Sequence, residues 1–168
     1  MHGVFLHSSK DNQRQKKGNS SRQYRYDRSE RGELKPMDAI SELFAAAAAA
    51  RSNAYAPYSR FAVGAAIRSA SGAIYSGANV ENAAYPVGIC AEESAIAAMI
   101  SAGEKEIAEV LIVAESAEPV MPCGACRQRL FEFATKDTKL HSAGPEGWRK
   151  TLAFAELLPH PFGPHDLK

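Results

Sequence analysis

The stretch ICAEESAIAAMISAG, Ile89–Gly103, lies between two runs of strand-like sequence and indicates how the chain folds. Its Ala-rich body predicts a helix, because Ala has the highest helix propensity, and Gly103 is typical of a residue that ends one. Before it, FAVGAAIRSASGAIYSGANV (61–80) contains two strand-like runs joined by SASG, which predicts a β-hairpin. After it, EIAEVLIVAES (106–116) is an apolar run of the kind found in buried strands.

The rest of the chain adds helices and strands to this unit. MDAISELFAAAAAARSNAY (37–55) predicts a first helix, which Pro57 ends. PCGACRQRLFEFA (122–134) predicts a third helix, and KLHSAG (139–144) and RKTLAF (149–154) predict two short strands. The C-terminal AELLPHPFGPHDLK predicts a brief helix that runs into a Pro-rich tail. Strand-helix-strand order indicates an α/β fold with a mixed sheet and helices packed over it.

The composition is that of a soluble globular protein. Of 168 residues, 45% are hydrophobic and 23% are charged, which is close to the average for single soluble domains. No window has the roughly 18 apolar residues that a membrane span needs. The N-terminus also lacks a signal-peptide pattern. We therefore expect a cytoplasmic protein without a membrane partner.

Residues 1–36 differ in composition from the rest. They contain nine Lys or Arg, four Asp or Glu and few aliphatic residues, so we expect a disordered basic extension; a nucleic-acid-binding arm is the alternative. We expect residues 37–168 to form the single domain and Met37 to be the natural start. The domain has eleven basic and fifteen acidic side chains. It lacks the basic face that a nucleic-acid binder needs, so we expect no nucleic-acid partner.

Three cysteines, Cys90, Cys123 and Cys126, are the candidate metal ligands. The C-x2-C spacing of the last two lets two thiolates bind one tetrahedral zinc, although a redox pair or chance gives the same pattern. Cys90 and Cys123 each open a predicted helix, where free N–H groups and the positive dipole end stabilise an anion. Structural zinc usually has four Cys or His ligands, whereas catalytic zinc has three and leaves one position for water. No histidine stands in a ligand-like motif, and His141 is only an outside candidate for a fourth ligand, so a catalytic zinc is favoured.

Glu92 is the candidate proton carrier beside this zinc. With Cys90 at the N-cap, Glu92 lies in the first helical turn, where it can share a cleft with the Cys90 sulfur and move a proton from water. The alternative is that an acid in a first turn only favours the helix dipole, and this alternative fits Glu93 well. Cys-x-Glu followed by Pro-Cys-x-x-Cys is a pattern of zinc deaminases, in which the Glu is not a ligand.

The sequence resembles the cytidine deaminases of the short, three-cysteine, homotetrameric kind. The resemblance covers about Asp38 to Leu167 and includes YAPYSRFAVGAA, GANVENAAYPVGICAEE, PCGACRQ and ELLPHPFGPHDL. It implies a three-layer α/β/α sandwich around a mixed sheet of about five strands. It also implies one Zn2+ per subunit, and deamination of cytidine and deoxycytidine to uridine and deoxyuridine plus ammonia, in pyrimidine salvage. The partner is then a small pyrimidine nucleoside, and the sites are shared between the subunits of a homotetramer.

The resemblance also implies roles for single residues. Cys90, Cys123 and Cys126 hold the zinc, and Glu92 shuttles protons. Phe61 packs against the pyrimidine, Asn79 and Glu81 bind the ribose hydroxyl, and the remaining substrate residues are Ala83 and Tyr85 in a site formed across subunits, Ala91, and Phe162 from a neighbouring chain. The alternatives are turn chemistry for Asn79, a solvated acid for Glu81, and core aromatics for Phe61 and Phe162.

Three other functions compete with this one. A deaminase that acts on nucleic acid needs a basic surface, and a deaminase of a nucleoside-like antibiotic is disfavoured by the intact NVEN motif, Asn79–Asn82. A structural zinc module needs a fourth protein ligand.

The sequence departs from its relatives at Glu93, where many three-cysteine cytidine deaminases carry an Arg that binds the cysteine sulfurs. Zinc with three thiolates carries a net negative charge, which an acid facing the metal would increase. We therefore expect Glu93 to turn away from zinc, with the helix N-termini and Arg127 offsetting the charge.

Overall fold

The computed structural model describes residues 36–167, and the expectations for residues 1–35 lie outside this part of the chain. The elements occur in nearly the expected order. They are α1 (Pro36–Arg51), β1 (Val63–Ser69), β2 (Ile74–Ala78), α2 (Ala91–Ser101), β3 (Ile107–Ala114), α3 (Gly124–Phe131), β4 (Ala134–Gly144) and β5 (Gly147–Ala153), with short 3-10 helices η1 (Tyr85–Val87), η2 (Phe154–Glu156) and η3 (Pro164–Leu167). The brief C-terminal helix that we expected is replaced by η2 and η3.

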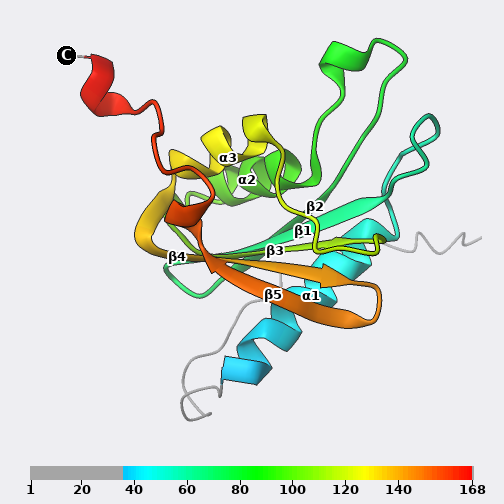
Figure 1. Ribbon diagram of the computed structural model, residues 1–168, viewed down its shortest axis with the longest axis horizontal. Helices are drawn as coiled ribbons and strands as arrows, with labels where there is room; N and C mark the ends of the chain where they lie inside the picture. Colours follow the sequence, from blue (N-terminus) through cyan, green and yellow to red (C-terminus); the bar gives the residue numbers. More distant parts are fainter. Residues whose placement is uncertain (1–35, 168) are drawn as a thin grey trace, which may run out of the picture.

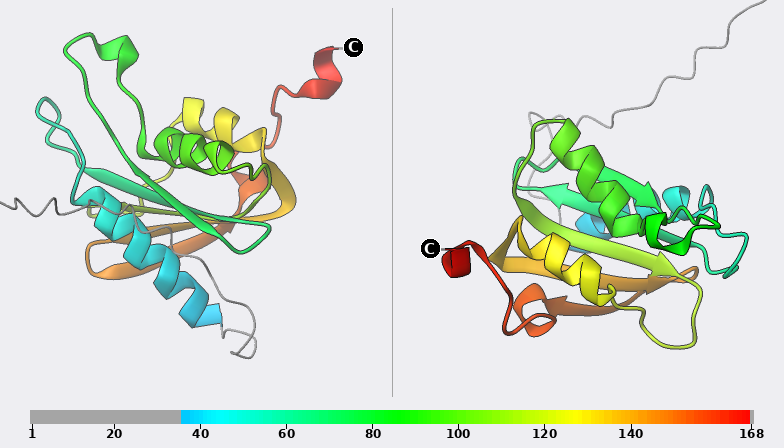
Figure 2. Two further views of the ribbon diagram at one scale, coloured as in Figure 1. Left: turned by 180° about the vertical axis from the view of Figure 1, so that it is seen from behind. Right: turned by 90° about the horizontal axis from the view of Figure 1, so that it is seen from above.

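The five strands form one mixed sheet in the order β2-β1-β3-β4-β5. β1 is antiparallel to both β2 and β3, β3 is parallel to β4, and β5 returns antiparallel to β4. Helices α2 and α3 cover one face and α1 covers the other (Figures 1 and 2). The expected three-layer α/β/α sandwich is therefore confirmed.

The strand directions decide where the two helices α2 and α3 begin. Because β2 and β3 are both antiparallel to the β1 strand between them, they run in the same direction and end at the same edge of the sheet. Each is followed by a loop and then by a helix, so both helices start near that edge, as Figure 2 shows. In α/β sheets, ligands bind outside the carboxyl ends of such strands.

Gly77 lets α2 lie unusually close to β2. A Cβ at this position would be 2.5 Å from the Ala95 backbone nitrogen and 2.7 Å from the Ala91 carbonyl oxygen. Real Cβ atoms do not approach backbone atoms so closely, because close-packed interiors leave no such overlap. The missing side chain of Gly77 therefore sets the height of the first turn of α2 above the sheet.

Each face of the sheet has its own apolar core. Under α2 and α3 the buried residues include Ile67, Met99, Ile112, Leu130 and Leu140. Under α1 they are Leu43, Ala47, Ala66, Leu111, Val113 and Ala143. Neighbours in sequence such as Leu140 and His141 therefore lie on opposite faces of the sheet, as the period of two along a strand requires.

One boundary differs from the expectation. We expected the third helix to continue to Ala134, but α3 ends at Phe131 and β4 begins at Ala134. The Ile107 N–H donates to the Phe133 carbonyl over 2.9 Å, and Ile107 pairs with Ala134 in the sheet. Pairing with β3 therefore prevails over the helical preference of this segment. Among residues 36–167, no helix is long and apolar enough to cross a membrane.

Candidate active site

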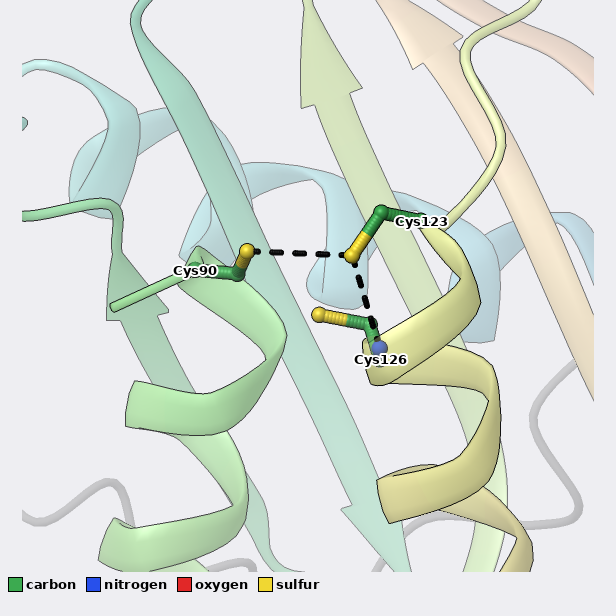
Figure 3. Close-up of side chains that lie close together, drawn as sticks. All are labelled: Cys90, Cys123 and Cys126. Atoms are coloured by element: carbon green, nitrogen blue, oxygen red, sulfur yellow. Dashed lines mark hydrogen bonds between the residues drawn. The ribbon is translucent and has the colours of Figure 1, made fainter. Parts of the chain in front are cut away.

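The three cysteines meet at the N-termini of α2 and α3. Cys90 is the N-cap of α2 and Cys123 the N-cap of α3, both with extended backbone, and Cys126 lies in the first turn of α3. Figure 3 shows the three side chains converging between the two helix ends. The Cys90 and Cys123 sulfurs are 4.0 Å apart, and the Cys126 N–H donates to the Cys123 sulfur over 3.5 Å. The expected positions at the helix starts are therefore confirmed.

The donor set fits a zinc ion. The three sulfurs lie within 4.8 Å of one another, and a tetrahedral zinc with Zn–S bonds of about 2.3 Å requires sulfurs about 3.8 Å apart. Cys126 is buried, Cys90 is half-buried and Cys123 is exposed, so one side of the cluster is open to solvent. Three sulfurs and an open side correspond to a catalytic zinc site with one free position.

The thiol groups of the cluster interact with one another. A hydrogen bond from Cys126 lowers the pKa of Cys90 to about 7, although burial opposes this shift. The same hydrogen bond, together with burial, raises the pKa of Cys126. Zinc binds thiolates, so its binding must release protons from this cluster.

Glu92 lies in the first turn of α2 and is only 5% exposed. Burial raises the pKa of its carboxyl group, while interactions with its own N–H and with Cys126 oppose the increase. The carboxyl group is therefore next to the sulfur cluster, as expected. A glutamate with a raised pKa near a metal can both accept and return a proton.

Glu93 points toward α3 instead of toward the sulfurs. Its carboxylate is 3.5 Å from the Arg129 guanidinium. The group of possible metal ligands found in residues 36–167 consists of the three cysteines and does not contain Glu93. Arg127 donates to the carbonyls of Pro122 (2.8 Å) and Leu157 (3.3 Å). The guanidinium of Arg127 thus binds backbone oxygens beside the cluster, and Arg129 is the cation that Glu93 meets.

His141 is not a fourth ligand, and that possibility was wrong. It is buried on β4, where Nδ1 is 2.7 Å from the Thr151 hydroxyl and Nε2 is 3.5 Å from a Glu109 carboxylate oxygen. Its side chain is on the α1 face, because its neighbour Leu140 belongs to the core under α2 and α3. The sheet therefore separates His141 from the cysteines.

A cavity of about 450 Å3 extends from Cys90 to the loops that follow α1 and β2. Its volume is within the range of small-molecule sites. Both Asn79 and Glu81 line it, together with Tyr58, Ser59, Val80, Asn82, Tyr85, Gly88, Ile89 and Cys90. Asn79 and Glu81, on the segment that follows β2, therefore line the same cavity as Cys90.

The polar side chains of the cavity are held in place by backbone groups. Asn79 accepts from the Val63 N–H (2.8 Å) and donates to the Phe61 carbonyl (2.9 Å). One Glu81 oxygen accepts from the backbone N–H groups of Tyr58 (2.8 Å) and Ser59 (3.2 Å). The Ser59 side chain and these two N–H groups lower the pKa of Glu81, which keeps it ionised.

The other expected substrate residues lie farther from the cavity, with one exception. Tyr85 lines it, and its ring centroid is 6.1 Å from that of Tyr58. Phe61 is 40% exposed and Phe162 is 60% exposed, so neither is a core aromatic. Ala83 is exposed, and Ala91 is buried in the first turn of α2.

Sequence reasoning missed the part played by Tyr58 and Ser59. Their backbone N–H groups orient Glu81 across 23 and 22 residues of sequence. The only sequence feature that points to them is the turn-forming PYS after α1, which gives no indication of its partner. Arg129 was also missed, because its contact with Glu93 depends on how two helices pack.

The comparisons with known proteins agree with this geometry. Residues 37–142 match the family model described as the cytidine and deoxycytidylate deaminase zinc-binding region. A cytidine deaminase of Halalkalibacterium halodurans is 42% identical over 118 residues, which cover 70% of this chain and 89% of the relative. One of Sporosarcina psychrophila is 39% identical over 128 residues, covering 76% and 94%.

Solved structures show the same relationship. The crystal structure of cytidine deaminase from Burkholderia pseudomallei has a TM-score of 0.69 and 37% identity, and it covers 77% of this chain and 100% of that one. The structure from Mycobacterium tuberculosis has a TM-score of 0.63 and 36% identity, with coverage of 73% and 96%. The chain therefore belongs to the cytidine and deoxycytidylate deaminase family of zinc-binding enzymes.

Proposed function

We propose that the chain catalyses the zinc-dependent hydrolytic deamination of cytidine and deoxycytidine to uridine and deoxyuridine, with release of ammonia, as a cytoplasmic enzyme of pyrimidine salvage. One observation carries the proposal. The buried Glu92 lies beside a three-sulfur cluster, and one cysteine of that cluster, Cys90, lines a cavity that Asn79 and Glu81 also line. Names of relatives that are about 40% identical support the choice of substrate.

In this proposal Cys90, Cys123 and Cys126 hold the zinc ion. When bound, zinc lowers the pKa of water and so supplies a nucleophile near neutral pH. Glu92 takes the proton from the attacking water and transfers it to N3 of the cytosine ring. After water has added at C4, Glu92 takes the second proton from the new C4 hydroxyl and passes it to the amino group as the C4–N bond breaks and the C4 carbonyl forms. The sum is cytidine plus water giving uridine plus ammonia, and Glu92 ends in its starting state. Its raised pKa suits this double role.

Asn79 and Glu81 are proposed to bind the ribose. One amide hydrogen of Asn79 is used by the Phe61 carbonyl, which leaves the second free to donate to a hydroxyl. One oxygen of Glu81 is used by Tyr58 and Ser59, which leaves the other free to accept from a hydroxyl. The pair therefore offers one donor and one acceptor in fixed positions, which matches the hydrogen-bonding capacity of a sugar hydroxyl.

We further propose a homotetramer in which neighbouring subunits complete each site. Phe61 and Ala91 would contact substrate within one subunit, while Ala83, Tyr85 and Phe162 would act across the interface. The exposed aromatic side chains around the cavity support this arrangement, because Tyr58 is 50% and Tyr85 76% exposed in the single chain. Large apolar side chains grouped at a surface mark interaction sites.

The decisive experiment is a spectrophotometric assay. We expect ultraviolet absorbance to decrease when cytidine or deoxycytidine is added, and the decrease to stop after a strong chelator and resume after zinc is restored. An unchanged absorbance with the zinc-loaded protein would contradict the proposal and favour a structural zinc module. Mass measurement by light scattering tests the tetramer separately, and a monomer with full activity would rule out shared sites.

A further inference from the structure

The C-terminal arm, residues 161–167, leaves the body of the molecule beside α3. Figures 1 and 2 show η3 projecting beyond the helix layer, at the opposite end from the long loop that precedes α2. That loop lines the cavity, and Phe162 does not line the cavity of its own chain. The arm therefore presents Phe162 away from the site that this same chain contains.

The backbone of the arm is nevertheless fixed on α3. The Gln128 side-chain amide donates to the Phe162 carbonyl over 2.8 Å. Gly163 is buried, and a Cβ there would be 3.0 Å from the His165 ring of the arm and 3.1 Å from Cε1 of Phe131 on α3. The Gly163 N–H donates to the Asp166 carboxylate (2.8 Å), and the Asp166 N–H donates back to the Gly163 carbonyl (2.9 Å). These contacts fix the chain at Phe162 and immediately after it.

The side chain of Phe162 is exposed even though its backbone is held. Its exposed fraction is 60%, so the ring gains little burial to offset the conformational entropy lost in ordering the arm. Such an arrangement is favourable when the ring is buried by another molecule. The same chain supplies a fitting receptor, namely an aromatic-rimmed cavity with Tyr58 and Tyr85 exposed. One chain thus carries both the exposed Phe162 ring and a cavity that can receive it. In a symmetric oligomer the ring of one copy can therefore enter the cavity of a second copy.

We propose that Gln128 is a positioning residue for the deaminase site of a neighbouring copy. By holding the Phe162 carbonyl on α3, Gln128 fixes the direction in which the ring leaves the arm. The same helix carries Cys123 and Cys126, so the arm is also fixed relative to its own metal centre. This inference rests on the proposed function, in which Phe162 covers the base bound by another subunit.

The expected effect of losing this bond falls on substrate binding. Without the Gln128 donor the arm samples other directions, and the ring covers the base for only part of the time. The loss of one neutral hydrogen bond corresponds to a rise in KM of about five-fold, with kcat changed less than about two-fold. Zinc content is expected to stay at that of the unaltered protein, because Gln128 does not contact the cysteines.

The test is a double-mutant cycle between Gln128 and Phe162. Gln128→Met keeps the length of the side chain but removes the donor, and Phe162→Ala removes the ring but keeps the carbonyl. We expect Gln128→Met to raise the KM for cytidine about five-fold in the normal background and to have almost no effect in the Phe162→Ala background. Glu132→Gln, at the exposed C-cap of the same helix, is the matched control that leaves the arm untouched.

The possible outcomes separate the inference from the proposed function. If Phe162→Ala leaves KM unchanged, the role of Phe162 in the proposed site fails. If Phe162→Ala raises KM but Gln128→Met has the same effect in both backgrounds, or reduces zinc content, Gln128 does not act through Phe162 and the inference is overturned. Gly163→Ala provides a second variant should Gln128→Met fold poorly. Its added methyl meets the His165 ring of the arm and the Phe131 ring of α3. The arm is therefore displaced next to Phe162, and the same dependence on Phe162 is expected.

Discussion

Glu92 and Glu109 are two glutamates withdrawn from solvent in very different surroundings. Glu92, in the layer above the sheet, has no cationic partner among the described residues, and burial raises its pKa. Glu109 lies on the α1 face, where the nearby His141 ring and a hydrogen bond from Arg68 lower its pKa despite partial burial. The same side chain thus has a raised pKa where it is buried without a cationic partner and a lowered pKa where charged and polar partners are close.

The polar groups around Glu109 form a chain across the sheet. The Arg68 guanidinium binds one Glu109 oxygen at 3.1 Å and also donates to the Ala39 carbonyl of α1 (2.7 Å). His141 approaches the other Glu109 oxygen and contacts the Thr151 hydroxyl. β1, β3, β4 and β5 are thereby connected on one face, so we interpret this chain as structural.

The largest expected effect is the loss of turnover in Glu92→Gln. The amide cannot accept and return a proton, so kcat for cytidine is expected to fall about 10^3-fold, as for other general acid–base residues. Steady-state assays together with zinc analysis check this. The same substitution at Glu109 is the control and should leave kcat within about two-fold. Near-normal turnover in zinc-loaded Glu92→Gln would remove Glu92 from the mechanism.

The next largest effect is expected from displacing α2, which lies with α3 on the face of the sheet that carries the cysteines. Gly77→Val places a side chain where the Ala91 carbonyl oxygen and the Ala95 nitrogen already lie within 2.7 Å of a Cβ position. We expect destabilisation of about 3 kcal/mol and a zinc content well below one per chain, because Cys90 begins this helix. Metal analysis and thermal unfolding measure the two effects. Gly124→Ala is the control, since a Cβ there meets no atom within 4 Å, and full zinc content in Gly77→Val would refute this account of the helix height.

A substitution on the α1 face of the sheet should lower the free energy of unfolding and leave turnover unchanged. Glu109→Gln leaves His141 without its carboxylate and leaves Arg68 with only the Glu42 carboxylate at 3.4 Å. The loss of a hydrogen bond to a charged group costs about 2 kcal/mol. Urea denaturation gives the free energy of unfolding, and kcat/KM is measured on the same preparation. A stability equal to that of the unaltered protein would show that the polar chain contributes nothing net.

The two glutamates should also give opposite pH dependences of stability. The folded pKa of Glu109 is below its unfolded value, so its contribution is complete above about pH 4.5 and is lost as the pH falls through the folded pKa. The folded pKa of Glu92 in the metal-free chain is raised, so its ionisation above that range opposes folding. The free energy of unfolding of Glu109→Gln and Glu92→Gln, measured without metal over a series of pH values, tests this. Glu109→Gln should remove the acid-side loss, and Glu92→Gln should stabilise the metal-free chain at neutral pH. A reversed pattern would contradict both assignments.

The sequence was sufficient for those parts of the site that depend on short spacings. C-x2-C brings two sulfurs to one place within a single helical turn, and Cys-x-Glu does the same for a sulfur and a carboxyl group at an N-cap. The mixed sheet with helices packed over it followed from the alternation of strands and helices, whereas the three-layer order came from the family resemblance. These features need only local geometry, so one chain with no structure was enough to predict them.

What the sequence did not reveal depends on pairing between distant segments. His141 looked available as a ligand until the register of β4 placed it on the other face. The end of α3 was predicted too late because pairing with Ile107 competes with helix formation. The partners of Glu81 are backbone groups of Tyr58 and Ser59, and backbone groups carry no signature of residue type.

The two N-cap cysteines have a consequence for how the protein acquires its metal. Cys90 and Cys123 follow different strands, β2 and β3, which are held apart and aligned by β1. A complete three-sulfur site therefore exists only after these three strands have paired, and zinc binds the native chain far more tightly than the unfolded one. By mass action, the ion should raise the melting temperature in proportion to the logarithm of its free concentration. The fraction of chains that hold zinc would then measure the fraction in which β1, β2 and β3 have paired correctly.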